Sequence, residues 1–413
     1  MATQRDVTKR VVVVGGGQAG FQTCATLRDN GFAGSLTLIC GEGVLPYQRP
    51  PLSKGYLTGD DEDIVLRTEP YYGQHQIDIV NGTAVDIERS DREVILDDGS
   101  RLGYDRLVLA TGARPRALPV PGSRLNGILP LRTDTDADAL RKALTGCRRL
   151  AVIGGGFIGL EVAAAARKLD VQTTVVESLP RTMARALSAE MSAHLTRVHR
   201  DHGATILLGR LVTAFDGDAT GHVRKVVLDD GTRLEADLVV IGIGIVPNVE
   251  LAIVAGLRVD NGIVVDEYLR TADERIYAVG DCASYPSRYA RGLVRLESVQ
   301  NAVDQGTCVA RSIAGQPATY DALPWFWSDQ HDVNLQIAGI STGHDRTVVV
   351  GEESRFSVFC FRQGTLIAVE SANKAIDHVI SRRVFASGNL PAPEEVAAPG
   401  FSLKEFAAGP TAG

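Results

Sequence analysis

Two short glycine-rich segments in this 413-residue chain have the spacing of a phosphate-binding turn. Each follows an apolar run, VVVV (11–14) or LAVI (150–153), and each precedes an alanine-rich stretch with helical character. The glycines are Gly15, Gly17 and Gly20 in the first segment and Gly154, Gly156 and Gly159 in the second. Between a buried strand and a helix, such glycines let the backbone approach a pyrophosphate at the helix N-terminus. One segment alone is weak evidence, but two in one chain predict two dinucleotide sites.

An acidic residue about 20 positions after the second glycine segment predicts which nucleotide binds there. Glu177 ends the predicted strand QTTVVE (172–177), where a carboxylate accepts hydrogen bonds from ribose hydroxyls and repels a 2′-phosphate. The sequence therefore favours NADH over NADPH, although Arg181 and Arg185 follow closely and would soften that preference.

The corresponding strand of the first segment, residues 36–40, has no acid at its end. It closes with Cys40 and Gly41, and the acid arrives one place later than usual, at Glu42. We therefore expect the two sites to hold different ligands. Two dinucleotides in one chain suggest hydride transfer from a nicotinamide to a flavin.

The elements that position these residues repeat along the chain. After each glycine segment we expect a helix (to about 30 and 169), a second strand, an Asp-Gly hairpin (94–100 and 226–234) and a buried strand ending in a glycine turn (106–115 and 237–248). A further helix is predicted over 298–315, and strands over 346–352 and 355–362 predict a small antiparallel α+β domain. The expected fold class is α/β, with two Rossmann-like domains of glutathione-reductase type and a C-terminal α+β domain. The expected domains are 1–112 with 245–318 for FAD, 113–244 for NAD, and 319–413 as an interface domain.

Composition excludes several classes of protein. The formal net charge of −7 argues against a general nucleic-acid binder. No stretch approaches the length of a membrane helix and no signal peptide precedes the first strand, so we expect a cytoplasmic protein without a membrane partner. The cysteines have no C-x-x-C spacing, so we expect buried, reduced thiols and neither a metal site nor a dithiol centre. The eight histidines show no ligand spacing and are expected at the surface.

Five motifs carry a resemblance to a known family: PYQRPPLSK (46–54), ATG (110–112), GGGFIGLE (154–161), YAVGDCA (277–283) and WFWSDQ (325–330). Together they resemble the FAD-dependent ferredoxin reductases of putidaredoxin-reductase type, which serve bacterial cytochrome P450 and dioxygenase systems. The resemblance runs from about Val11 to Leu403. RPPLSK and the tryptophan-bearing segment are far more specific than the glycine segments.

The resemblance implies roles at matching positions. For FAD these are Gly15, Gly17 and Ala19 at the pyrophosphate, Glu42 at the ribose, Arg49 and Lys54 along the flavin, Val85 near the adenine, Ala110, Thr111, Gly112 and Arg132 flanking the cofactor, Asp281 on a ribityl or phosphate-linked hydroxyl, Val299 at the isoalloxazine, and Trp327 at the flavin edge. For NAD they are Gly154, Gly156, Ile158, Gly159, Glu161, Glu177, Arg185 and Gly244. Gly41 departs from the family pattern and puts the adenosine contacts there in doubt.

Lys54 and Glu161 are the candidate catalytic residues. A cation beside the flavin stabilises the negative charge that develops on reduction, and in the family pattern Glu161 pairs with this lysine near the nicotinamide. Each has a simpler interpretation: Lys54 as an exposed lysine after a proline-rich turn, and Glu161 as a carboxylate favoured by a helix dipole. Asp281 similarly fits the N-cap of the next helix.

The tryptophan segment suggests a protein partner. Strand alternation puts Trp325 and Trp327 on one side, and in the family the second tryptophan lies near the flavin edge that faces the iron–sulfur protein. Ferredoxins of this type are acidic, so a basic rim is expected, with Arg67, Arg291, Arg295 and Arg311 as candidates.

The sequence therefore predicts an NADH-dependent reductase that passes electrons through FAD to a 2Fe–2S ferredoxin. The missing cysteine pair disfavours a disulfide reductase. A rubredoxin reductase shares most motifs and is the main alternative. An NADH oxidase or peroxidase would need a reactive cysteine near the flavin, and a flavin-binding protein without turnover, like apoptosis-inducing-factor-like proteins, would be expected to add basic or targeting segments.

Overall fold

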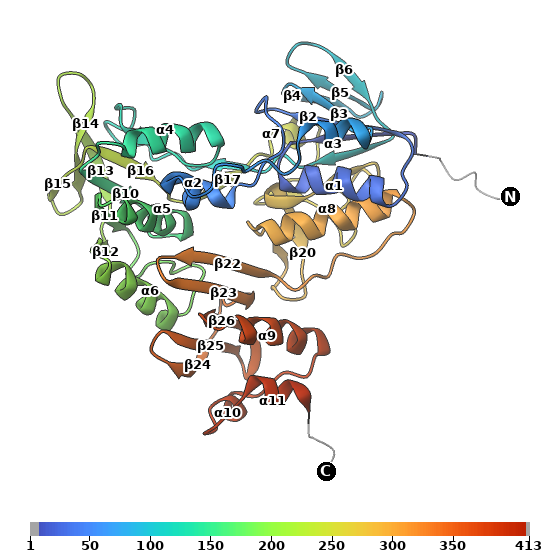
Figure 1. Cartoon of the computed structure of the whole chain (residues 1–413). Coiled ribbons are helices and arrows are strands. Elements are labelled where there is room, and N and C mark those ends of the chain that lie inside the picture. Colours follow the sequence, from blue (N-terminus) through green and yellow to red (C-terminus); the bar gives the residue numbers. More distant parts are fainter. Residues whose placement is uncertain (1–7, 410–413) are drawn as a thin grey trace. The chain divides into compact units, whose positions relative to one another are not determined.

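The computed structural model describes residues 8–409, which form two compact units (Figure 1). Unit 1 consists of the described residues of Met1–Gln48 together with Ile64–Arg114 and Val246–Ala322. Unit 2 consists of Arg49–Asp63, Pro115–Ile245 and the described residues of Leu323–Gly413. None of the helices within 8–409 has both the length and the apolar character needed to cross a membrane.

Unit 1 is built on a five-stranded parallel sheet. In spatial order its strands are β3 (Asp78–Asn81), β2 (Ser35–Cys40), β1 (Arg10–Val14), β7 (Arg106–Leu109) and β19 (Ile276–Ala278). All four valines of β1 are buried, as expected for a central parallel strand. Helices α1 (Gln18–Asp29) and α8 (Val299–Ile313) lie side by side within this unit (Figure 1).

The ends of these helices follow from local sequence. Gly31, with φ +75°, lies just past the end of α1, as the sequence predicted. Ser298 caps α8 by accepting the Asn301 N–H at 3.1 Å. The other elements of unit 1 are β4 (Ala84–Glu88), β5 (Glu93–Leu96), β6 (Arg101–Gly103), α3 (Glu69–Gln74), α7 (Glu250–Val254), β18 (Ile263–Val264), η2 (Gly280–Cys282), β20 (Ala283–Pro286) and β21 (Leu293–Val294). Strands β8 (Ala113–Pro115) and β17 (Ile245–Pro247) lie where the chain passes between the units.

Unit 2 repeats the parallel sheet with the same arrangement around its first strand. Its order is β12 (Thr205–Leu208), β11 (Gln172–Glu177), β10 (Arg149–Ile153), β16 (Leu238–Ile241) and β9 (Ile128–Leu129). The neighbouring elements are η1 (Pro50–Ser53), α2 (Gly55–Thr58), α4 (Asp134–Leu144), α5 (Phe157–Lys168), α6 (Ala189–Asp201), β13 (Val212–Gly217), β14 (Val223–Leu228) and β15 (Arg233–Glu235). The repeat extends to single hydrogen bonds: Gly15 N–H donates to Ile39 O at 2.9 Å, and Gly154 N–H donates to Val176 O at 2.8 Å.

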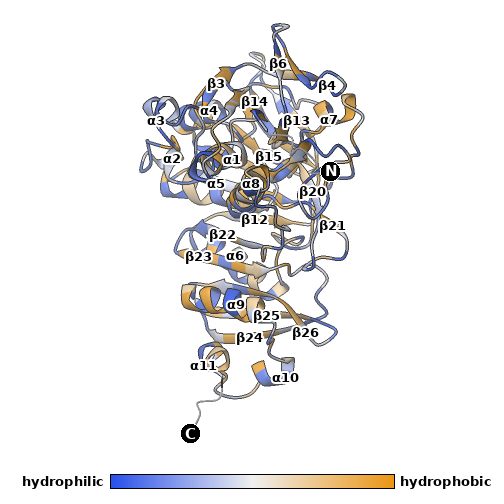
Figure 2. Ribbon diagram, turned by 90° about the vertical axis from the view of Figure 1, so that its right-hand side faces the viewer, coloured by the Kyte–Doolittle hydropathy of each residue, from blue (hydrophilic) through white to orange (hydrophobic). Residues whose placement is uncertain are grey.

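The C-terminal part of unit 2 is an antiparallel five-stranded sheet covered by α9 (Ala375–Ser387). Its order is β22 (Trp325–Gln330), β23 (Val333–Gly339), β26 (Thr365–Ala372), β25 (Arg355–Arg362) and β24 (Arg346–Glu352), followed by α10 (Pro393–Val396) and α11 (Leu403–Ala408). Helix α9 carries both hydrophobic and hydrophilic residues (Figure 2), and it contacts β23 and β26 of this sheet. The predicted fold class, with two Rossmann-like domains and a C-terminal α+β domain, is confirmed. The expectation that the tail packs poorly at its very end concerns residues 410–413 and lies outside the described residues.

Candidate functional site

Both glycine turns have a middle glycine that faces open space. A Cβ added at Gly17 or at Gly156 would meet nothing within 4 Å. The flanking glycines differ: a Cβ at Gly15 would lie 2.1 Å from Ala110 O, and one at Gly154 would lie 2.4 Å from Gly242 O. Both flanking residues also have positive φ, +118° and +106°. The fold therefore requires the first glycine, whereas the middle one leaves room for a ligand's phosphates beside a helix N-terminus.

The side chain of Glu177 packs directly against the second glycine turn, beside Gly155, and forms the floor of that turn. Its side chain is 9% exposed, and its carboxylate accepts the N–H of Gly155 at 2.7 Å and the N–H of Leu179 at 2.8 Å. These bonds fix the carboxylate at the end of β11, where the sequence predicts the ribose of NAD. Ile158, also in the set predicted for NAD, is 44% exposed and lies on the first turn of α5.

The first turn has a different floor. A Cβ at Gly16 would lie 2.6 Å from the Cys40 Sγ, so the thiol occupies the place that the Glu177 carboxylate takes in the second turn. The displaced acid, Glu42, accepts the hydroxyl of Tyr47 at 2.6 Å. Burial raises the pKa of the Cys40 thiol to about 11. Cys40 is therefore a buried neutral thiol, as the sequence predicted, and the charged group stands two residues further on.

Lys54 and Glu161 form the predicted ion pair. The Lys54 Nζ lies 2.7 Å from Glu161 Oε2, and the Glu161 side chain is only 2% exposed. Two hydroxyls complete its shell: Ser53 donates to Oε2 and Ser328 to Oε1, both at 2.5 Å. A buried carboxylate needs such partners, because an unpaired one carries a large desolvation cost. Glu161 is thus a fixed charge rather than a carboxylate that merely suits a helix dipole, and it lies beyond the first turn of α5.

A polar chain extends from Glu161 into the C-terminal sheet. Gln330 Nε2 donates to Ser328 Oγ at 3.0 Å, and Gln330 Oε1 lies 2.9 Å from His199 Nε2. Because the Gln330 amide donates toward Ser328, its oxygen accepts from the Nε2–H tautomer of His199. Every donor in the chain therefore points toward Glu161, and aligned hydrogen bonds reinforce one another.

The histidines correct one expectation. His194, His199 and His378 are buried rather than on the surface. His331 stacks on His202 with ring centroids 4.0 Å apart and lies 4.8 Å from the His199 ring. Burial lowers the pKa of His199 and lowers that of His331 to about 3, so both rings are neutral at neutral pH. Sequence spacing missed the cluster because it joins α6 to the β22–β23 turn.

Several residues predicted to contact the flavin form hydrogen bonds within their own unit. In unit 1, Thr111 and Gly112 are held by Asn248: the Thr111 hydroxyl donates to Asn248 O at 2.6 Å, and the Asn248 N–H donates to Gly112 O at 2.9 Å. In unit 2, Arg49 Nη1 donates to Arg132 O at 2.8 Å. Val85, 48% exposed, lies on β4, and Val299 is the first residue of α8.

Asp281 does not have the N-cap role that the sequence also allowed. It lies inside the short helix η2, whose N-cap is Val279, and Ser298 caps α8. Arg295 Nη1 donates to the backbone carbonyl of Asp281 at 3.1 Å.

The two tryptophans share one side of β22, as strand alternation predicted. Their ring centroids are 5.6 Å apart, and the Arg382 guanidinium lies 4.7 Å from the Trp325 ring centroid. Of the four arginines proposed for a basic rim, Arg67, Arg291 and Arg311 are exposed. The expectation is wrong for Arg295: its side chain is 8% exposed and pairs with Glu297 at 2.8 Å.

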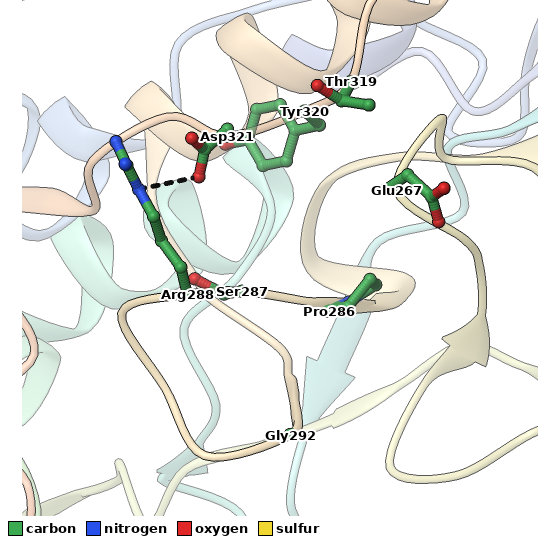
Figure 3. A pocket seen from close by; sticks show the side chains of 8 residues that line it. All are labelled: Glu267, Pro286, Ser287, Arg288, Gly292, Thr319, Tyr320 and Asp321. Atoms are coloured by element: carbon green, nitrogen blue, oxygen red, sulfur yellow. Dashed lines mark ion pairs between the residues drawn. The ribbon is translucent and has the colours of Figure 1, made fainter.

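All six cysteines are free thiols, and Cys147 and Cys308 are only half-buried. Within residues 8–409 no group of three His, Cys, Asp or Glu side chains is arranged to hold a metal ion. A cavity of about 380 Å³ in unit 1 lies between the 286–292 loop and residues 319–321, where Arg288 pairs with Asp321 at 2.9 Å (Figure 3). It is lined by Glu267, Pro286, Ser287, Arg288, Gly292, Thr319, Tyr320 and Asp321. None of the predicted site residues lines it.

Sequence reasoning missed the residues that position the predicted ones. Ser53 and Ser328 both stand inside motifs that carry the family resemblance, PPLSK and WFWSDQ, but no spacing rule connects either with Glu161. Tyr47, which lies inside the motif PYQRPPLSK, was likewise not predicted as a partner of Glu42.

Comparisons with known proteins agree with this architecture. The model of the pyridine nucleotide-disulphide oxidoreductase family matches residues 9–306, and a reductase C-terminal domain matches 325–407. The chain belongs to this family.

Individual relatives are reductases of electron-carrier proteins. The chain is 49% identical to rhodocoxin reductase of Rhodococcus erythropolis over 402 residues, which cover 95% of this chain and 93% of that protein. The crystal structure of a ferredoxin reductase for the CYP199A2 system from Rhodopseudomonas palustris is 43% identical, with a TM-score of 0.94 over 97% of this chain and 100% of that one. A covalent putidaredoxin reductase–putidaredoxin complex matches with 40% identity and a TM-score of 0.94, covering 97% and 98% of the two chains. A rubredoxin-NAD(+) reductase of Pseudomonas putida is 40% identical over 88% of this chain and 95% of its own length.

Proposed function

We propose that this chain is an NADH-dependent flavoprotein reductase that passes electrons through FAD to a 2Fe–2S ferredoxin serving a cytochrome P450 or related oxygenase. The observation that carries this proposal is the pair of matched glycine turns, each with an open middle position. One turn would serve each dinucleotide. The relatives that match along nearly the whole chain are reductases of small electron carriers, which supports the same assignment.

In this proposal the first turn holds FAD and the second holds NADH. The FAD-binding domain would comprise 1–112 and 245–318, the NAD-binding domain 113–244, and the interface domain 319–413. When bound, NADH supplies a hydride and FAD accepts it and releases electrons one at a time. The chain itself contributes binding, orientation and charge, because no acid–base chemistry on a substrate is required.

Lys54 is the proposed cation beside the flavin. Its ammonium is held by Glu161, and Glu161 is held by two serine hydroxyls, so the position of the charge is set before any ligand binds. Replacing Lys54 with Ala would leave a buried carboxylate without its counter-ion, so both FAD retention and its reduction by NADH should suffer. Lys54→Arg keeps the charge and serves as the matched control.

Trp327 of unit 2 is proposed to face the ferredoxin, and the exposed Arg67, Arg291 and Arg311 of unit 1 remain the candidates for a basic rim. Trp327→Ala should slow reduction of a ferredoxin more than reduction of ferricyanide, because the small acceptor needs no docking surface. Equal losses with both acceptors would remove Trp327 from this role.

The central test is an anaerobic titration of the purified protein with NADH and, separately, with NADPH, followed through the visible absorbance of the flavin. Bleaching at near-stoichiometric NADH is the expected result. A protein that takes up no FAD, or a flavin that neither nucleotide reduces, would contradict the proposal and favour a binding protein without turnover.

A rubredoxin acceptor is the second candidate, because rubredoxin reductases are among the full-length relatives. Steady-state reduction of a 2Fe–2S ferredoxin and of a rubredoxin by the same preparation separates the two. We expect the higher kcat/KM with the ferredoxin, and the reverse order would assign the chain to rubredoxin.

A further inference from the structure

The segment 178–188 connects Glu177, at the end of β11, with helix α6, and it carries Arg185. Its path is irregular, with Met183 at φ +50°. One local contact ties it to the glycine turn: the Met183 N–H donates to Gly155 O at 2.9 Å. The Arg181 guanidinium folds back onto the carbonyls of Ala184 and Leu187 at 2.9 and 2.7 Å.

Three side chains of the C-terminal domain hold the far half of this segment, two from the β23–β24 loop and one from β26. Ser341 Oγ donates to Ala186 O at 2.7 Å, and Thr342 Oγ1 donates to Arg185 O at 3.2 Å. The Glu370 carboxylate accepts the N–H of Ser188 at 2.9 Å and its hydroxyl at 2.6 Å. These bonds act on the carbonyl of Arg185 itself and on the backbone of Ala186 and Ser188, so they fix the course of the segment where it leaves Arg185.

The contact between the Glu370 carboxylate and Ser188 is buried, so it forms at the expense of the solvation of both groups. Both Glu370 and Ser188 have no exposed surface, and burial raises the pKa of the Glu370 carboxyl. A polar group in such a place is tolerated only with partners, which here are the N–H and hydroxyl of Ser188 and the hydroxyl of Ser341. Ser188 also caps α6, so the same residue ends the segment and begins the helix.

The held segment presents Arg185 to the nucleotide side of the sheet. Its Nη2 lies 3.6 Å from the position that a Cβ on Gly244 would take, and Gly244 has φ +102°. Both residues are in the set proposed for NAD. A guanidinium beside a glycine turn is suited to a phosphate or adenosine group, provided that its backbone is fixed.

We propose that Ser341, Thr342 and Glu370 are positioning residues for nicotinamide-nucleotide binding: the C-terminal domain holds the 178–188 segment so that Arg185 faces the NAD site. The affinity for NADH then depends on a domain that contributes nothing to the glycine turn itself. This inference rests on the proposed NADH site in the second half of the chain.

The test compares Glu370→Ala with Ser371→Ala in the FAD-loaded protein. Ser371 is the next residue on β26, is equally buried and bonds Ser357 instead of the segment, so it is the matched control. For Glu370→Ala we expect the Kd of NAD⁺ from calorimetry to rise about tenfold, while the flavin-reduction rate at saturating NADH stays within about twofold. Deuterium exchange over 178–188 should increase without nucleotide. Ser371→Ala should change none of these.

Two further variants keep the test decisive. Glu370→Gln keeps an acceptor for the Ser188 hydroxyl and should give an intermediate Kd. Thr342→Val alters an exposed hydroxyl, so it threatens the fold least, and a rise of about two- to threefold is expected. Arg185→Ala should raise the Kd of NAD⁺ by a smaller factor in the Glu370→Ala variant than in the unmodified protein, because both substitutions act through the Arg185 guanidinium.

An unchanged Kd in Glu370→Ala or Thr342→Val, equal effects in Ser371→Ala, or strictly additive losses with Arg185→Ala would each overturn the inference. Failure of the proposed function would be visible separately, because the unmodified protein would then not bind NADH at all.

Discussion

The two glycine turns have nearly the same backbone and different floors. Gly17 and Gly156 both precede their helices with φ −83°, and their ψ values are −172° and −175°. Beneath the first turn lies the Cys40 thiol, whereas beneath the second lies the Glu177 carboxylate bonded to Gly155 N–H. The two turns therefore share a backbone that suits any pyrophosphate, and they differ in the side chain at the end of the second strand, which selects the nucleotide.

The largest expected effect separates the glycines that the fold needs from those that the ligand needs. Gly154→Ala should lower the free energy of unfolding by about 2–5 kcal/mol, because positive φ and a carbonyl contact both oppose a Cβ. Gly156→Ala should change it by no more than about 1 kcal/mol but weaken NADH binding about tenfold or more. Denaturant unfolding and NADH titration measure the two quantities.

The same pair in the first turn, Gly15→Ala and Gly17→Ala, should repeat the pattern with FAD retention in place of NADH affinity. Equal unfolding losses at Gly154 and Gly156 would show that the open space at the middle glycine is not reserved for a ligand.

Glu177→Arg should narrow or reverse the preference for NADH, because a cation replaces the carboxylate that repels a 2′-phosphate. The ratio of the NADH and NADPH dissociation constants should shift about tenfold or more. Glu177→Gln, which removes the charge but keeps an acceptor oxygen for only one of the two N–H groups of Gly155 and Leu179, shows how much of the change comes from a loosened turn. Unchanged selectivity in Glu177→Arg would remove Glu177 from the ribose.

In the first half the acid is Glu42, positioned by Tyr47. Tyr47→Phe deletes the hydroxyl that bonds this carboxylate and should weaken FAD binding by about 1 kcal/mol, roughly fivefold, without affecting NADH selectivity. Fluorescence titration of the FAD-free protein gives the affinity. A change in the ratio of the NADH and NADPH dissociation constants would instead mean that the residues near the first glycine turn affect the second nucleotide site.

The smallest effect concerns the thiol floor. With its pKa raised to about 11, Cys40 should be about one part in a thousand thiolate at pH 8. Its alkylation by iodoacetamide in the native protein should be slow and should accelerate only as the pH approaches 11. Half-buried Cys147 is the internal control, quantified by mass spectrometry. Labelling of Cys40 as fast as that of Cys147 would show that the floor is open.

Most of the fold was predictable because its signals are local. The strands over 11–14, 172–177, 346–352 and 355–362 and the helix after each glycine turn all appear where the sequence pattern placed them. The pairing of Lys54 with Glu161 was also predicted, but through the family resemblance rather than through spacing.

The doubled nucleotide-binding unit, the acid at Glu177 and the late acid at Glu42 could all be recognised from the sequence. These are properties of short segments, whose backbone conformation and burial follow from nearby residues. Other features became visible only in the folded structure. His199 and the Arg295 side chain are buried. Ser53 and Ser328 bond Glu161, and Glu370 bonds Ser188. Each of these contacts joins residues distant along the chain, and no periodicity records such pairs. They form because buried polar groups must find partners wherever the packing of sheets and helices brings one within reach.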